Sequence, residues 1–151
     1  VFLNLVALGL LGRRLVGHYA LARAAAPVAA ALVLFFVEHF VGLGRLDWLW
    51  PITSAAWLWV VARRRDVLRA HWRVEAAVAA ALAWRYASPS IVASSEKIGD
   101  LAMIASYLPG TRLPPVDAWF PPYPFDVYYS FQHYAAALLG RAFGMGPGLT
   151  Y

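Results

Sequence analysis

The sequence predicts an all-α fold: a polytopic transmembrane helical domain with an extracytoplasmic loop that contains an amphipathic interfacial helix. The 151 residues are 62% hydrophobic and only 14% charged, whereas soluble domains have about 45–50% apolar and about 25% charged residues. Arginine clusters separate the apolar segments, and basic connections alternate with neutral or acidic ones. An apolar excess of this size indicates that lipid is the solvent.

The composition also excludes several classes of function. Cysteine is absent, which excludes disulfides, thiolate metal sites and thiol nucleophiles. The net charge of +5 would suit nucleic acid, but the arginines cluster between apolar segments, as topogenic charges do. We therefore expect membrane lipids as partners and no nucleic acid.

The apolar segments predict five spans within one larger transmembrane domain, of which residues 1–151 are a fragment. A spanning helix needs about 20 residues, so the short opening run is expected to be truncated. The predicted spans are residues 1–12, 27–43, 48–62, 74–87 and 127–143.

Local signals support these bounds. Pro27 suits the first turn of the second span, and the glycines of residues 42–44 end it. Trp48 suits an interfacial aromatic belt at the start of the third span. Residues 74–87 are rich in alanine, which permits close helix packing. Arg141 is expected toward the inner end of the last span.

The connections predict the topology. Residues 13–26 contain three arginines and no acid, and residues 63–73 contain five arginines and one acid. The turn at 42–47 is neutral, and residues 88–126 contain two basic and four acidic side chains. By the positive-inside rule, residues 13–26 and 63–73 are cytoplasmic and residues 88–126 are extracytoplasmic. We expect the plasma (inner) membrane as the location.

The outer loop is predicted to begin with a helix over residues 96–108, capped by Ser94 or Ser95. A short amphipathic helix of this kind lies on the membrane surface. Pro109 and Gly110 end it, and the proline-rich stretch that follows predicts an irregular loop. The apolar face comprises Ile98, Leu101, Ala102, Ile104, Ala105 and Leu108.

Two carboxylates open this helix. Glu96 and Asp100 are four residues apart and share a helix face. Together they could bind a divalent cation through oxygen, or one could act as a general base. Lys97 beside them could hold a phosphate. The alternative is an ordinary solvated helix start.

Asp117 lies among prolines, which stiffen the backbone and suit a positioned carboxylate. It is the first candidate for a catalytic or metal-binding acid. In the alternative interpretation, Asp117 makes a side-chain turn to its own backbone and Trp119 anchors the loop at the interface. Asp126 is predicted to cap the next helix.

His133 lies one helical turn after Tyr129, with Tyr128 adjacent, at the predicted membrane boundary. It could be a metal ligand, a base or a donor to phosphate, or it could be satisfied by helix packing. Glu38 and His39 lie toward the outer end of the second span, where charge is costly and marks functional sites.

Glu38 has a second interpretation without function, in which it pairs with Arg45 or Arg85. Arg85 lies near the outer end of its predicted span. It could contact a lipid phosphate or an acid of the outer loop.

Four motifs in residues 95–151 together resemble the YYY-motif polytopic membrane proteins. In order they are SEK-x-x-D, LPP-x-D-x-W-F, YY-x-F-x-H and G-x-x-P. The chain departs from the family pattern because Ser130 replaces the third tyrosine and Val127 replaces the preceding asparagine. That family is distantly similar to membrane glycosyltransferases that use lipid-linked sugars.

The resemblance implies transfer of a sugar from a polyprenyl-phosphate donor on the extracytoplasmic side. The expected catalytic residues are Asp117, Glu96, Asp100 and His133. The expected substrate- and phosphate-binding residues are Lys97, Arg112, Tyr128, Tyr129 and Trp119. A divalent cation, if one is used, would bind Glu96, Asp100 and Asp117.

Two other functions stay open: a transporter or lipid-handling protein without covalent chemistry, and a non-catalytic membrane scaffold subunit. Transporters place ionisable groups within their spans. Here the acids concentrate in the outer loop, which favours an enzyme.

Overall fold

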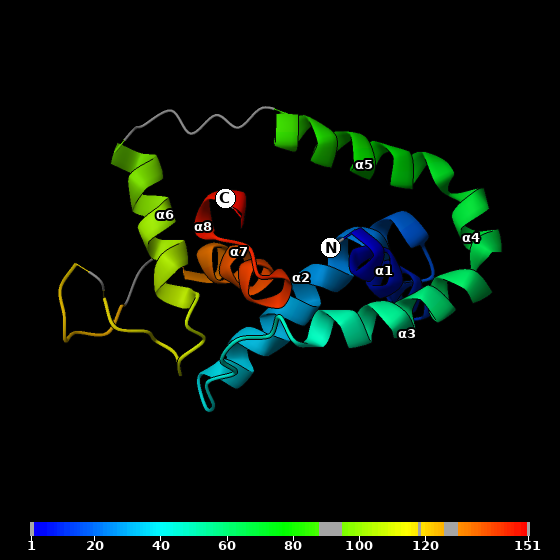
Figure 1. Cartoon of the computed structure of the whole chain (residues 1–151). Helices are drawn as coiled ribbons and strands as arrows, with labels where there is room; N and C mark the ends of the chain where they lie inside the picture. Colours follow the sequence, from blue (N-terminus) through cyan, green and yellow to red (C-terminus); the bar gives the residue numbers. More distant parts are fainter. Residues whose placement is uncertain (1, 88–94, 118, 126–129, 151) are drawn as a thin grey trace. The chain divides into compact units, whose positions relative to one another are not determined.

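The computed structural model describes residues 2–87, 95–117, 119–125 and 130–150, and every regular element among them is a helix (Figure 1). The all-α prediction is therefore confirmed for the described residues. The helices are α1 (Phe2–Val16), α2 (Tyr19–Glu38), α3 (Leu49–Arg63), α4 (Arg65–Ala70), α5 (Trp72–Ala87), α6 (Ser95–Tyr107), α7 (Ser130–Phe143) and α8 (Pro147–Thr150).

The chain divides into two compact units. The first comprises residues 1–29 and 51–90, and the second comprises residues 30–50 and 91–151. The first unit thus contains α1, the start of α2, and most of the α3–α5 region. The second contains the end of α2 with α6, α7 and α8. Each unit has its own hydrophobic core.

The second helix begins earlier than its sequence predicts. α2 starts at Tyr19 rather than at Pro27, so the proline lies inside the helix. A proline there costs a backbone hydrogen bond, but the alanine-rich residues before it have high helix propensity. The predicted connection over residues 13–26 shrinks to Gly17 and His18, and Gly17 has a positive φ of 77°.

Among the described residues, α2 is the one helix whose length and composition suit a membrane crossing, with 20 residues and a mean hydropathy of 2.1. At 1.5 Å per residue it extends about 30 Å, the thickness of a bilayer core. Val33 and Phe36 on α2 are well exposed, as lipid-facing side chains would be.

The other predicted spans correspond to shorter helices. α1 and α3 each have 15 residues, α5 has 16 and α7 has 14. Such helices extend about 21–24 Å, less than the ~30 Å bilayer core. Crossing of the membrane by these segments therefore stays a prediction.

In the first unit, α1 packs closely on α2 because small residues line the contact. A Cβ on Gly9 would lie 2.8 Å from Cδ of Arg23, and a Cβ on Gly12 would lie 2.9 Å from Cβ of Ala26. Small residues allow helix backbones to approach in this way. The core beside this contact comprises Val6, Leu10, Tyr19 and Val67.

Arg23, one of the arginines of the predicted connection over residues 13–26, forms a buried ion pair in that unit. Its side chain is buried, and its Nε donates to Oε1 of Glu75 at 3.0 Å. The hydroxyl of Tyr19 donates to the same oxygen at 2.5 Å. The ion pair explains how Glu75 is accommodated in a segment predicted to be a span.

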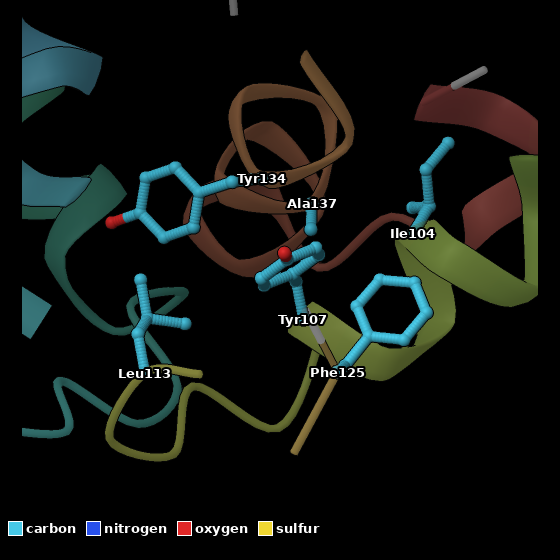
Figure 2. Packing of buried hydrophobic residues seen from close by; sticks show 6 residues of the cluster. All are labelled: Ile104, Tyr107, Leu113, Phe125, Tyr134 and Ala137. Carbon is cyan, nitrogen blue, oxygen red and sulfur yellow. The ribbon is translucent and has the colours of Figure 1, made fainter. Parts of the chain in front are cut away.

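In the second unit, aromatic side chains from α6, α7 and the loop between them form the core. Figure 2 shows Ile104, Tyr107, Leu113, Phe125, Tyr134 and Ala137. The rings meet edge to face, a favourable arrangement: the centroid of Tyr107 lies 6.0 Å from that of Phe125 and 5.9 Å from that of Tyr134.

The predicted apolar face of α6 is only partly buried. Ile104 is 1% exposed, whereas Ile98 is 59% exposed. Tyr107, which the predicted face omitted, is buried in the core instead. α6 thus buries one edge against α7 and leaves another apolar edge uncovered.

The proline-rich loop after α6 is irregular, as predicted, but it closes on itself. Val116 and Pro124 form an isolated antiparallel bridge. The amide of Asp117 donates to the carbonyl of Tyr123 at 2.9 Å, and that of Phe125 donates to Pro115 at 2.7 Å. This closure carries Phe125 back into the core.

Two turns of the second unit, at Gly44 and at Gly110, approach each other closely. Gly110 has a φ of 66°, and its carbonyl accepts a hydrogen bond from the amide of Gly44 at 2.9 Å. A Cβ on Gly110 would lie 2.5 Å from the carbonyl oxygen of Gly44 and 2.6 Å from Nη2 of Arg141. Only glycine fits this position without displacing backbone.

We predict that Gly110→Ala lowers the free energy of unfolding by about 2 kcal/mol or more, because it combines left-handed strain with overpacking. Equilibrium unfolding in detergent micelles measures this loss. Gly146→Ala is the control, because nothing lies within 4 Å of its added Cβ and its φ is not positive. Equal stability of the two variants would contradict the contact.

Candidate functional site

The candidate site centres on a carboxylate–imidazole pair at the contact between α6 and α7. Asp100 of α6 and His133 of α7 join through Oδ1 and Nε2 at 2.9 Å. The side chain of His133 is 5% exposed and that of Asp100 is 27% exposed. An ionised carboxylate only accepts, so Nε2 donates. The buried imidazole therefore orients a carboxylate that is partly exposed.

Helical spacing places other predicted residues beside Asp100. Lys97 precedes it by one turn on α6 and is partly buried. Glu96 also belongs to α6, but its side chain lies outside the described residues. Cη2 of Trp119 lies 3.7 Å from the position of a Cβ on Gly99. An aromatic ring and the partly exposed carboxylate thus border the same stretch of helix.

Asp117 is engaged with its own loop. Its Oδ1 accepts a hydrogen bond from the backbone amide of Trp119 at 2.7 Å. This is the side-chain turn considered as the alternative in the sequence analysis. Asp117 consequently holds the backbone that positions the Trp119 ring over α6.

Arg112 lies in the loop after the C-terminal end of α6, whereas Asp100 lies in the first half of that helix. Its Nε donates to the carbonyl oxygen of His39 at 3.0 Å, and the side chain is exposed. Tyr128, Tyr129 and Asp126 lie outside the described residues. The structure thus brings together Asp100 and His133 and sets Arg112 apart from them.

The predicted cation site is not assembled from the side chains that the structure describes. Within them, no three histidine, aspartate or glutamate side chains lie close enough to hold a metal ion. Asp100 and His133 supply two potential ligands, and Asp117 is committed to its turn. A divalent cation at this site stays a prediction.

A small pocket lies where the end of α2, the end of α6 and the start of α7 meet. Its volume is about 150 Å³, and Ser130 and His39 are the polar groups in an otherwise apolar and aromatic wall. Nδ1 of His39 lies 2.8 Å from the carbonyl oxygen of Phe35 and donates to it. Sequence reasoning missed this pocket, because its walls are distant in the chain. The remaining lining residues are Phe35, Tyr107, Leu113, Pro114 and Phe125.

The buried charge of α2 has a partner that was not predicted. Arg141 donates from Nη1 to Oε2 of Glu38 at 2.9 Å and from Nη2 to Oε1 at 2.6 Å. The exposed fractions of the two side chains are 1% and 0%. The predicted pairing of Glu38 with Arg45 is wrong, since Arg45 bonds to Asp47. That hydrogen bond holds the pKa of Asp47 below its usual range.

Two backbone groups complete the ion pair. The amide of Leu43 donates to Oε1 of Glu38 at 3.1 Å, and Nε of Arg141 donates to the carbonyl oxygen of Gly44 at 2.9 Å. Two charges within apolar segments are expected to pair. Applying that rule to Arg141 as well as to Arg85 would have identified the partner from the sequence.

The ion pair also shows that the predicted depths of Glu38 and Arg141 cannot both hold. The sequence analysis placed Glu38 toward the outer end of one span and Arg141 toward the inner end of another, but they are in contact. The ring of Phe35 lies 5.7 Å from that of Phe131 and 5.1 Å from that of Tyr134. Both the start and the end of α7 therefore lie against the last turns of α2.

Tyr134 of α7 lies beside both the ion pair and the aromatic side chains of the second unit. Its hydroxyl is buried and makes no hydrogen bond of ordinary geometry with another described residue. Glu38 and Arg141 are its charged neighbours. The ring packs against Phe35 and Tyr107, so Tyr134 links the ion pair to the aromatic core.

The fold of the described residues is helical, and α2 is long and apolar enough to cross a membrane. The chain belongs to the family described as "Uncharacterized membrane protein (DUF2298)", which it matches over residues 14–151. The match confirms that the chain is a membrane protein, and it confirms the resemblance at the level of an uncharacterised membrane protein family. The plasma membrane and the topology stay predictions. No curated protein and no solved structure matches the chain.

We predict that Arg141→Gln lowers the free energy of unfolding by about 3–5 kcal/mol, because it leaves Glu38 buried without its counter-charge. Adding Glu38→Gln should cost less than the sum of the two single changes. Equilibrium unfolding in detergent micelles measures all three variants.

Arg45→Gln is the matched control for this cycle. It removes an arginine from an exposed ion pair in the same unit, so we expect little change in stability. Strict additivity of Glu38→Gln and Arg141→Gln would contradict a coupled pair.

Proposed function

We propose that this protein transfers a sugar from a polyprenyl-phosphate donor to an acceptor hydroxyl on the extracytoplasmic side. The supporting observation is the Asp100–His133 pair, in which a buried imidazole holds a partly exposed carboxylate at 2.9 Å. A carboxylate held by a hydrogen bond from a packed partner is suited to act as a positioned general base.

In the proposed step, the carboxylate of Asp100 takes the proton of the acceptor hydroxyl. The acceptor oxygen attacks the anomeric carbon of the sugar, and the bond from that carbon to the phosphate oxygen breaks. Polyprenyl phosphate leaves with the bonding electrons. Lys97, one turn before Asp100, would stabilise the charge on the departing phosphate, and the Trp119 ring would pack against the sugar.

The uncovered apolar edge of α6 supports this assignment. Ile98 is well exposed, although it belongs to a helix whose opposite edge packs against α7. An amphipathic helix with such an edge lies at the membrane interface. Asp100 would then lie near the level of lipid headgroups, where a lipid-linked donor has its phosphate. An outer location also favours this donor, because no nucleotide sugars are expected there.

A transporter would need an ionisable group that changes partners within the membrane. The pair of Glu38 and Arg141 is the candidate for such a group in α2. Both side chains of this pair are buried, and backbone groups of Leu43 and Gly44 form hydrogen bonds with them. These contacts favour a fixed structural role and leave the enzyme as the better-supported proposal.

We predict that Asp100→Asn in the full-length protein lowers sugar transfer about 10²–10⁴-fold, the usual contribution of a general base. The measurement is transfer of a radiolabelled sugar from a polyprenyl-phosphate donor in membrane vesicles. Asp47→Asn is the matched control, because it makes the same chemical change in an exposed turn, and we expect wild-type activity.

The companion variant Asp117→Asn separates the two candidate acids. Asparagine can still accept the hydrogen bond from the Trp119 amide, so this variant changes charge and preserves the turn. Loss of transfer in Asp117→Asn with full transfer in Asp100→Asn would overturn the assignment of the base. Absence of transfer by the wild type with every polyprenyl-phosphate sugar tested would overturn the function itself.

A further inference from the structure

A basic cavity lies in the first unit, among residues that the sequence analysis treated only as topology signals. Its volume is about 240 Å³. Arg13 and Arg14 come from the last turn of α1, and Arg64 comes from the junction between α3 and α4. The cavity is lined by Leu10, Arg13, Arg14, Gly17, Arg64 and Val67.

The three arginines line the cavity, and no acidic residue of the described chain is among its lining residues. None of them forms an ion pair with another residue in the described part of the chain, whereas Arg23 of the same unit pairs with Glu75. Like charges gathered around one space repel each other. A bound anion would reduce this repulsion, so the cavity favours a negatively charged ligand.

Two buried apolar side chains, one from α1 and one from α4, also line the cavity. Leu10 and Val67 are 6% and 5% exposed and belong to the core of the first unit. The cavity is smaller than the ~300–1,000 Å³ of typical sites for drug-sized ligands. Its size and its basic lining suit a small anion, either free or at the end of an apolar molecule.

We propose that this cavity binds a phosphate-bearing anion, with its phosphoryl oxygens on Arg13, Arg14 and Arg64. Guanidinium groups match phosphate oxygens with forked hydrogen bonds. All three arginines lie in stretches that the charge pattern assigns to the cytoplasm, and basic pockets between membrane helices on that side bind anionic headgroups. The phosphate could belong to a phospholipid headgroup or to a soluble ion.

Titration of the full chain in neutral detergent tests the proposal and separates the two sources. The probes are dihexanoyl phosphatidylglycerol and inorganic pyrophosphate, with dihexanoyl phosphatidylcholine as the zwitterionic comparison. Isothermal titration calorimetry gives each Kd. We expect at least one anionic probe to bind the wild type and to bind about 100-fold more weakly to R13Q/R14Q/R64Q.

The matched control is R65Q/R69Q/R73Q, which removes the same charge from exposed positions that do not line the cavity. We expect its Kd to stay within about threefold of the wild type. If the first triple variant does not fold, Arg64→Gln alone should weaken binding about fivefold. Gly110→Ala and Asp100→Asn change the other unit and should leave the Kd unchanged.

Preference for phosphatidylglycerol would assign the site to a lipid headgroup, and preference for pyrophosphate would assign it to a soluble phosphate. Equal weakening in both triple variants would show attraction by total charge and overturn the site. Failure of both anionic probes to bind the wild type, or equal binding of phosphatidylcholine, would also overturn it.

Discussion

The buried ion pair between Glu38 and Arg141 is the interaction on which the second unit depends. Removing two charges from water costs several kcal/mol per ion, and the cost is offset only when geometry and extra hydrogen bonds are good. Here both guanidinium nitrogens meet both carboxylate oxygens, while Leu43 and Gly44 bond to the same two side chains. One contact therefore joins the end of α2, the following turn and α7.

The candidate site follows from this arrangement. Arg141 and Tyr134 are seven residues apart and share the face of α7 that meets α2. His133 projects from a neighbouring face, toward α6, where it meets Asp100. The ion pair thus fixes the rotation of α7 about its axis, and that rotation brings the imidazole to the carboxylate. The aromatic contacts of Tyr107 with Tyr134 and Phe125 hold α6 and the loop in place (Figure 2).

Much of the helical organisation could be predicted from local pattern. α3 begins at Leu49 and α6 at Ser95, each within one residue of its predicted start. The predictions failed where contacts with residues distant in the chain changed the start of a helix or its buried face. The segment before Pro27 is helical and Arg23 within it bonds to Glu75, a partner about fifty residues away. Likewise, the buried edge of α6 includes Tyr107 because aromatic residues of α7 and the loop pack there.

The sequence by itself determined the membrane class and the helical fold and supplied the candidate site residues, because apolar runs and residue types are local properties. It singled out Asp100 and His133 but did not pair them with each other. The tertiary structure decided that pairing, the partner of Glu38 and the gathering of three arginines around one cavity. Each of these joins segments far apart in the chain, and their meeting depends on helix packing, which no local pattern specifies.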